Sequence, residues 1–89
     1  MNHVAPQAIV EQAFDGFLVR WRFILRDEEG EIRHLGDPHL TKLEAIADRS
    51  AMSRRAERDL HESDEDYWVL RCFRRSVYVT RDAPRISAS

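Results

Sequence analysis

The clearest pattern in this sequence is the ten-residue stretch Phe17-Leu18-Val19-Arg20-Trp21-Arg22-Phe23-Ile24-Leu25-Arg26. The side chains of a β-strand point alternately to its two faces, so every second residue of this stretch shares a side. One side then carries only apolar residues, namely Phe17, Val19, Trp21, Phe23 and Leu25. The other side places three arginines among two apolar residues, in the order Leu18, Arg20, Arg22, Ile24 and Arg26. The stretch therefore predicts a strand with one face in a core and one face that is solvated or binds a partner.

A polar turn and a returning strand are predicted after this stretch. The turn is Asp27-Glu28-Glu29-Gly30, with a glycine where a positive φ is required, and the returning strand spans Glu31–Leu35. Further on, Thr41-Lys42-Leu43-Glu44 matches a capping box, in which the threonine oxygen accepts the amide hydrogen of the glutamate. A helix is therefore expected from about Lys42 to about Leu60.

The segment before the arginine-bearing strand fits two structures. Pro6 near its start and Gly16 just past its end are typical of a short helix. Asp15-Gly16 between apolar flanks is instead typical of a type I′ hairpin turn. We favour the hairpin, in which Phe14 and Phe17 would face each other across the turn.

The expected helix has no single continuous apolar side. One stripe begins with Leu43, Ile46, Ala47 and Ser50, but its later turns carry Ser53, Arg54 and Glu57. A different face holds Ala45, Met52, Ala56 and Leu60. Three arrangements fit this pattern: a rotated buried stripe, a bend after Ser50, or contact of the second face with another surface such as a partner subunit.

Two more strands are expected near the C-terminus, because β-branched and aromatic residues fill Tyr67–Phe73 and Val77–Arg81. They would be joined near Arg74-Arg75-Ser76, and an acidic loop, Glu62–Asp66, would precede them. Residues 1–89 then form a single domain, with about residues 1–6 and 83–89 flexible. The predicted fold is α+β, a small antiparallel sheet of four to five strands with one main helix packed across one face.

Composition limits the class of protein. A chain of 89 residues, 43% hydrophobic and 34% charged, can form one folded domain with a densely ionic surface. No apolar run could span a membrane and the single cysteine cannot form an internal disulfide, so we expect a cytoplasmic protein. Self-association would add buried area, which is compatible with a homodimer. The net charge of -2 disfavours a general nucleic-acid binder.

Few residues point to catalysis or to metal binding. Cys72 is expected within a strand, without neighbours that would activate its thiol. The four histidines lack the spacing of zinc ligands, and only His34 and His39, on either side of Asp37, stand close together in sequence. The acidic run lacks the glycine of an EF-hand loop, and the three glycines stand in separate turns instead of one phosphate-binding loop. We therefore expect no enzyme, no metal and no cofactor.

Charge is strongly segregated along the chain, and the candidate binding residues follow from this segregation. The arginine side of the strand could bind phosphates or carboxylates, joined by Arg33 or Arg71 and flanked by Trp68 or Tyr78. The residues selected as candidates for partner contact are Arg20, Arg22, Arg26, Glu62, Asp64, Glu65, Asp66, Arg74 and Arg75.

Three functions fit these features. The first is a non-enzymatic small binding protein that acts by stoichiometric protein–protein contact. Lys42 is the only lysine among 14 basic residues, and this bias with the small size favours a phage or mobile-element inhibitor of a host complex, for example of the anti-CRISPR kind. The second is a nucleic-acid-binding module that uses the arginine-rich sheet face. The third is an accessory subunit of an oligomer.

Overall fold

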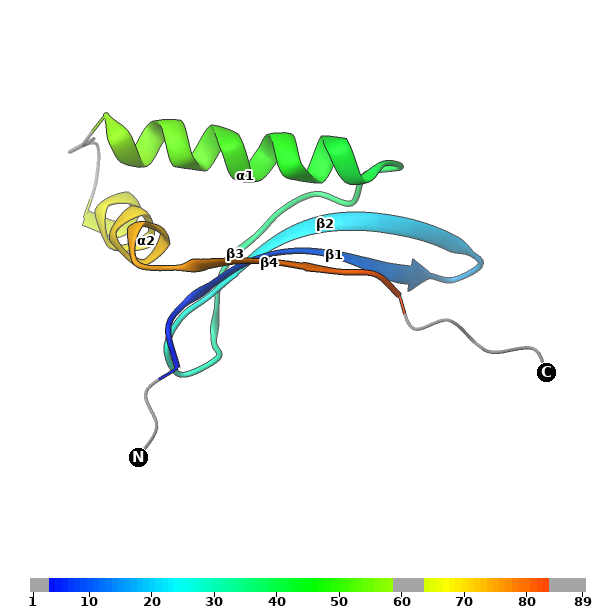
Figure 1. Cartoon of the computed structure of the whole chain (residues 1–89), viewed down its shortest axis with the longest axis horizontal. Coiled ribbons are helices and arrows are strands. Elements are labelled where there is room, and N and C mark those ends of the chain that lie inside the picture. Colours follow the sequence, from blue (N-terminus) through cyan, green and yellow to red (C-terminus); the bar gives the residue numbers. More distant parts are fainter. Residues whose placement is uncertain (1–3, 59–63, 84–89) are drawn as a thin grey trace.

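The computed structural model describes residues 4–58 and 64–83. Four strands form one sheet in the order β3-β2-β1-β4, in which β1–β2 and β2–β3 are antiparallel and β4 runs parallel to β1. In Figure 1, α1 lies along one side of this sheet and α2 lies at one end. The elements in chain order are β1 (Gln7–Asp15), β2 (Leu18–Arg26), β3 (Ile32–Leu35), α1 (Lys42–Glu57), α2 (Asp64–Arg74) and β4 (Val77–Arg81).

The α+β class and the main helix across one face are confirmed, but the sheet is mixed and not wholly antiparallel. The difference follows from α2, which replaces the strand predicted over Tyr67–Phe73. Without that strand, the chain between β3 and β4 is a crossover through two helices. A crossover of this length can deliver β4 parallel to β1, which a short hairpin cannot do.

The predicted hairpin between β1 and β2 is confirmed, and its turn lies one residue later than expected. Asp15 and Leu18 form the last pair of the ladder, so Gly16 and Phe17 make the turn. Gly16 has a φ of 66°, which explains the glycine at this position. The expected contact between Phe14 and Phe17 is wrong, because Phe14 lies opposite Val19 and Phe17 is exposed at the tip.

The core lies between one face of β1 and β2 and the two helices. Ala8 and Val10 of β1, with Phe23 and Leu25 of β2, are completely buried on this face. Against them pack Ala45, Met52 and Ala56 of α1 and Leu70, Cys72 and Phe73 of α2. The predicted core side of residues 17–26 is thus confirmed at Phe23 and Leu25.

Helix α1 begins as predicted and buries the second of its two apolar faces. The Thr41 hydroxyl accepts the N–H of Glu44 at 3.3 Å and donates to the Glu44 carboxylate at 2.8 Å, which is the expected cap. The buried stripe consists of Ala45, Met52 and Ala56, so the rotated stripe is the arrangement observed. This apolar side, which favoured an oligomer, is therefore used inside the chain. The predicted end of the helix near Leu60 lies outside the described residues.

The segment Tyr67–Phe73 is helical because its apolar residues follow a helical spacing. Val69, Cys72 and Phe73 stand at positions i, i+3 and i+4, so they share one side of α2 and contact the core. Residues 64–66, expected in an acidic loop, form the first turn of α2, where carboxylates suit the helix dipole. Glu62, and the predicted flexible ends at residues 1–3 and 84–89, lie outside the described residues.

The chain stays beside β2 after β3 ends. The N–H of Gly36 donates to the carbonyl oxygen of Phe23 at 2.7 Å, and a Cβ on Gly36 would lie 2.9 Å from that oxygen. His39 and Trp21 then exchange two backbone hydrogen bonds of 2.7 and 2.8 Å. These contacts extend the edge of the sheet and place the start of α1 over it. Neither α1 nor α2, the helices of the described ranges, is long and apolar enough to cross a membrane.

Candidate partner-binding surface

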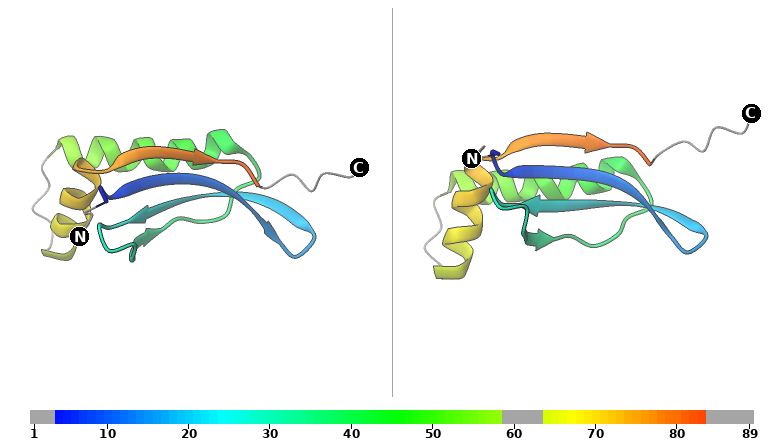
Figure 2. Two further views of the ribbon diagram at one scale, coloured as in Figure 1. Left: turned by 60° about the horizontal axis from the view of Figure 1, so that its bottom comes forward. Right: turned by 90° about the horizontal axis from the view of Figure 1, so that it is seen from below.

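The face of the sheet opposite the core carries the three arginines predicted to share a side. Arg20, Arg22 and Arg26 of β2 lie in register with Ala13, Glu11 and Gln7 of β1, respectively. Arg81 of β4 also lies in register with Glu11, from the other side of β1. Seen from below in Figure 2, the strands lie in front of α1, and no described helix covers them. We call this surface the arginine face, defined by Arg20, Arg22, Arg26 and Arg81.

The arginine face has an apolar centre. Ile9 and Ile24 are paired across β1 and β2, and their exposed fractions are 0% and 5%. Their nearest neighbours on the same face include the long side chains of Arg22 and Arg26, whose aliphatic stems shield apolar surface. Three further apolar side chains on this face are about half exposed: Leu18, Leu35 and Val77.

A hollow of about 190 Å³ opens on the arginine face. Its lining residues are Glu11, Ala13, Phe14, Asp15, Arg20, Arg22, Ile24 and Pro38. Pro38 is brought there by the bridge between His39 and Trp21. The Nε of Arg22 is buried and has no hydrogen-bond partner within the described chain. An unsatisfied buried donor costs roughly 1–3 kcal/mol, so an acceptor that entered the hollow would be stabilised.

The four arginines have few acceptors of their own. Arg20 donates to the carbonyl oxygen of Val19 at 3.3 Å, and Arg26 donates to that of Gly30 at 2.8 Å. Across residues 4–58 and 64–83, no carboxylate lies within 4.0 Å of any of the four guanidinium groups. The outward positions of β1, β2 and β4 hold these four positive charges and two negative ones, Glu11 and Asp15, a balance of +2. The whole chain has a net charge of -2, so this face is a positive patch on an acidic protein.

The aromatic and basic residues expected beside these arginines lie elsewhere. Tyr78 is in register with Ala8, on the core side, and its ring centroid lies 5.7 Å from that of Phe73. Arg71 lies over the ring of Trp68 on α2, at 5.6 Å from the centroid. Arg33 donates to Asp27 at 2.6 Å, at the turn between β2 and β3. The outward positions of β1, β2 and β4 consequently hold no aromatic side chain.

Three of the remaining candidate residues, Asp66, Arg74 and Arg75, connect α2 and its C-terminal end to the rest of the domain. Asp66 lies 3.6 Å from Arg55 of α1, and Arg75 lies 3.2 Å from Glu28 of the β2–β3 turn. Arg74 donates a hydrogen bond to the carbonyl oxygen of Ala56, near the end of α1. Of the acidic candidates, Asp64 is exposed at the start of α2, Glu65 belongs to its first turn, and Glu62 lies outside the described residues. The described members of the predicted set thus separate into the arginine face and a group at α2.

Sequence reasoning missed two features that the structure contains. Arg81 joins the arginine face only because β4 lies beside β1, and its alternation with Val77 and Val79 was the available signal. His39 lies between two carboxylates of α1: its Nε2 is 2.5 Å from Asp48 and its Nδ1 is 3.6 Å from Glu44. The hydrogen bond with Asp48 outweighs desolvation and raises the pKa of His39.

The described residues contain no assembled set of metal ligands. No group of three or more histidine, cysteine, aspartate or glutamate side chains is placed to hold a metal ion in residues 4–58 and 64–83. His34 lies against the ring of Phe23 at 5.5 Å, apart from the His39 cluster. Desolvation raises the pKa of the buried Cys72 thiol, which favours its protonated form.

The chemistry available on the arginine face is therefore recognition of acceptors. Guanidinium groups bind carboxylates or phosphates through two parallel N–H···O bonds. The half-exposed apolar residues around them add area that a partner could bury. No protein-family model, curated protein or solved structure matches this chain.

Proposed function

We propose that this protein is a non-enzymatic binding protein, which acts by stoichiometric contact with another protein through the arginine face. One observation carries the proposal: Arg20 and Arg22 line a hollow on an uncovered sheet face, and no carboxylate of the described chain pairs with them. Aspartate or glutamate side chains of a partner would supply the missing acceptors. Charge-assisted pairs of this kind set orientation and partner choice.

The apolar residues of the same face support a protein partner. Leu18, Leu35 and Val77 are exposed around the arginines, and protein interfaces combine such apolar area with polar contacts. Arginine is also one of the residue types that most often dominate binding energy at interfaces. The arginine face thus offers both the apolar area and the anchoring groups that a protein contact uses.

Two features make a nucleic acid the weaker candidate, although phosphates also pair with arginine. Proteins that bind single strands stack the bases on several aromatic side chains, whereas the outward strand positions of this face hold none and Phe14 is the only aromatic residue in the lining of the hollow. Glu11 and Asp15 lie among the arginines and interrupt the continuous positive track that a nucleic-acid backbone follows. The more specific expectation of a phage-encoded inhibitor stays a prediction, which the identity of the partner tests.

Affinity purification tests the proposal. The tagged full chain is isolated from the cells that encode it, treated with nuclease and analysed by mass spectrometry. We expect one protein in roughly equimolar amount that survives nuclease treatment. The Arg20→Gln, Arg22→Gln double variant should lose it, because glutamine keeps part of the aliphatic stem and removes the charge.

The matched control is the Arg54→Gln, Arg58→Gln double variant, which changes the net charge by the same amount. Both control residues are exposed and lie at the end of α1, away from the arginine face. This control should capture the partner as the wild type does. Recovery of nuclease-sensitive material alone, or equal capture by both double variants, would overturn the proposal.

A further inference from the structure

A second concave surface lies where the β2–β3 turn faces α2. This groove has a volume of about 590 Å³, which is within the range of sites that bind small ligands or a few peptide side chains. Ile32 and Trp68, two of its apolar lining residues, are 46% and 61% exposed. The other lining residues are Pro6, Val69 and Cys72 on the apolar side and Asp27, Glu28, Glu29, Arg33 and Arg75 on the charged side.

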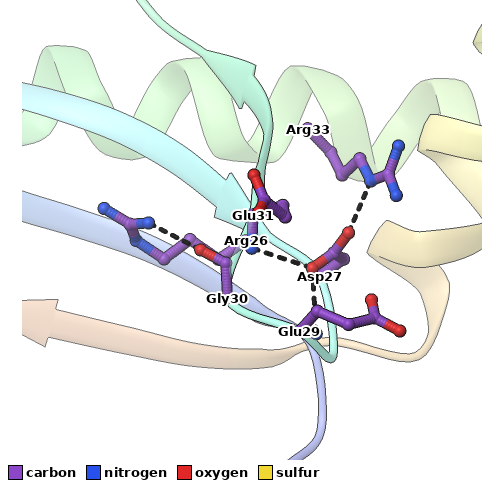
Figure 3. A network of polar contacts seen from close by, with 6 residues as sticks. All are labelled: Arg26, Asp27, Glu29, Gly30, Glu31 and Arg33. Atoms are coloured by element: carbon purple, nitrogen blue, oxygen red, sulfur yellow. Dashed lines mark hydrogen bonds and ion pairs between the residues drawn. The ribbon is translucent and has the colours of Figure 1, made fainter.

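The wall formed by the β2–β3 turn is fixed by Asp27 (Figure 3). Its Oδ1 accepts the backbone N–H groups of Glu29 and Glu31 at 3.0 and 2.9 Å, and its Oδ2 accepts from the Nε of Arg33 at 2.6 Å. Desolvation opposes ionisation, but these hydrogen bonds together lower the pKa of Asp27, so it is ionised at neutral pH. A wall held by three hydrogen bonds is already ordered before a ligand arrives.

The charges of the groove leave one carboxylate without an internal partner. Asp27 is paired with Arg33, and Glu28 is paired with Arg75 at 3.2 Å. Glu29 forms no ion pair with the described residues, and in Figure 3 its side chain extends toward α2. Figure 3 also shows Arg26, of the arginine face, pointing away from Arg33 on the other side of the turn. Three negative and two positive side chains line the groove, a balance of -1.

We propose that this groove binds a short segment of a partner protein in which a basic side chain stands next to a large apolar one. The apolar side chain would lie against Trp68 and Ile32, and the basic group would pair with Glu29. The preference for a basic segment is opposite to that of the arginine face, so the groove is a second binding site beyond the proposed function. An exposed tryptophan ring also attracts cations, as the position of Arg71 over Trp68 illustrates.

A peptide titration tests this site on the full chain. The probe is a capped hexapeptide of alternating leucine and arginine, added to ¹⁵N-labelled protein and followed by amide chemical shifts. We expect saturable shifts confined to residues 28–33 and 68–75, two segments that line the groove. Peptides that alternate serine with arginine, or leucine with glutamate, should shift these amides at least ten times less at equal concentration.

Two variants identify the contacts. The Glu29→Gln, Trp68→Ala double variant should bind the leucine–arginine peptide at least ten-fold more weakly, whereas the control pair Phe17→Ala, Glu57→Gln should stay within two-fold. Glu29→Gln alone removes an exposed carboxylate without an internal ion pair, so the fold is retained and binding should weaken up to about five-fold. Absence of saturable binding at millimolar peptide, or unchanged affinity in Glu29→Gln and in the double variant, would overturn this site without affecting the arginine face.

Discussion

Ile9 of β1 and Ile24 of β2 lie opposite each other on the sheet face that the helices leave uncovered, yet both are buried. Side chains at central positions of an uncovered sheet face are normally partly exposed to solvent. The burial of this pair therefore indicates shielding by neighbouring side chains on the same face. Arg22 and Arg26 flank Ile24 along β2, and Gln7 and Glu11 flank Ile9 along β1. The arginine side chains therefore have a packing role through their stems, and the binding role proposed above belongs to their guanidinium groups.

Truncation of Ile24 tests the shielding. Because Ile24 is 5% exposed, Ile24→Ala should lower the free energy of unfolding by about 2–4 kcal/mol, as for a core position. Leu35 lies beside it on β3 and is about half exposed, so Leu35→Ala should cost less than about 1 kcal/mol. Urea unfolding measures both, and similar small losses for the two variants would show that the face is not shielded.

Gly36 should tolerate no side chain. A Cβ at this position would lie 2.9 Å from the carbonyl oxygen of Phe23, which is backbone and cannot rotate away. We expect Gly36→Ala to lower the free energy of unfolding by about 1–3 kcal/mol, since the edge contact must open to relieve the clash. The nearby exposed Leu40 provides the control, and Leu40→Ala should stay within about 0.5 kcal/mol of the wild type. Equal stability of Gly36→Ala and the wild type would argue against this close approach.

Asp27 should make the protein less stable in acid. Its pKa in the folded protein lies below the ordinary value of 3.8, so its contribution is present above pH 3.8 and is lost as the pH falls through the folded pKa. Asp27→Ala removes the acceptor of three hydrogen bonds and should cost about 1–3 kcal/mol at neutral pH. Unfolding followed from pH 6 downward checks both effects. If the free energy of unfolding falls with decreasing pH as steeply in Asp27→Ala as in the wild type, other carboxylates cause this pH dependence.

His39 should make the protein less stable as the pH rises, which is the opposite of the effect of Asp27. Its pKa is raised above the ordinary value of 6.5, mainly by the hydrogen bond with Asp48, so the folded state binds the proton more tightly. The contribution of His39 is therefore complete below pH 6.5 and is lost as the pH rises through the folded pKa. We expect wild-type stability to fall from pH 6 to above neutrality, and His39→Gln to lose this component of the slope. Thermal unfolding at several pH values checks this. If the stability of the wild type and of His39→Gln changes equally with pH, His39 does not contribute to the pH dependence.

The elements fixed by local chemistry were predictable from the sequence. The two-residue period predicted over residues 17–26 is present over Leu18–Arg26, with Phe17 exposed in the turn. The glycine-containing turn at 27–30 and the Thr41 cap are also present, and all three depend on neighbouring residues. Helix α2 was missed because Trp68, Val69 and Phe73 favour strands when they are considered one by one. The spacing of Val69, Cys72 and Phe73 against the core decides the helix, and that depends on tertiary packing.

The candidate site was predictable only in part, for a related reason. The common side of Arg20, Arg22 and Arg26 follows from the strand period alone. Their lack of a covering helix depends on both helices packing on the other face, and Arg81 joins them only through the parallel register of β4. The groove combines residues that are 36 positions apart in the sequence, such as Ile32 and Trp68, and no local pattern connects them.

The affinity of the captured partner for three proteins tests the central claim most directly. Calorimetry at physiological salt compares the wild type, the Arg20→Gln, Arg22→Gln variant and the Arg54→Gln, Arg58→Gln variant. If the arginine face makes the contact, the first variant should bind about 30-fold more weakly or worse, which corresponds to about 2 kcal/mol for two lost charged hydrogen-bonded pairs. The second should stay within about two-fold of the wild type. Equal dissociation constants for all three proteins would contradict the account.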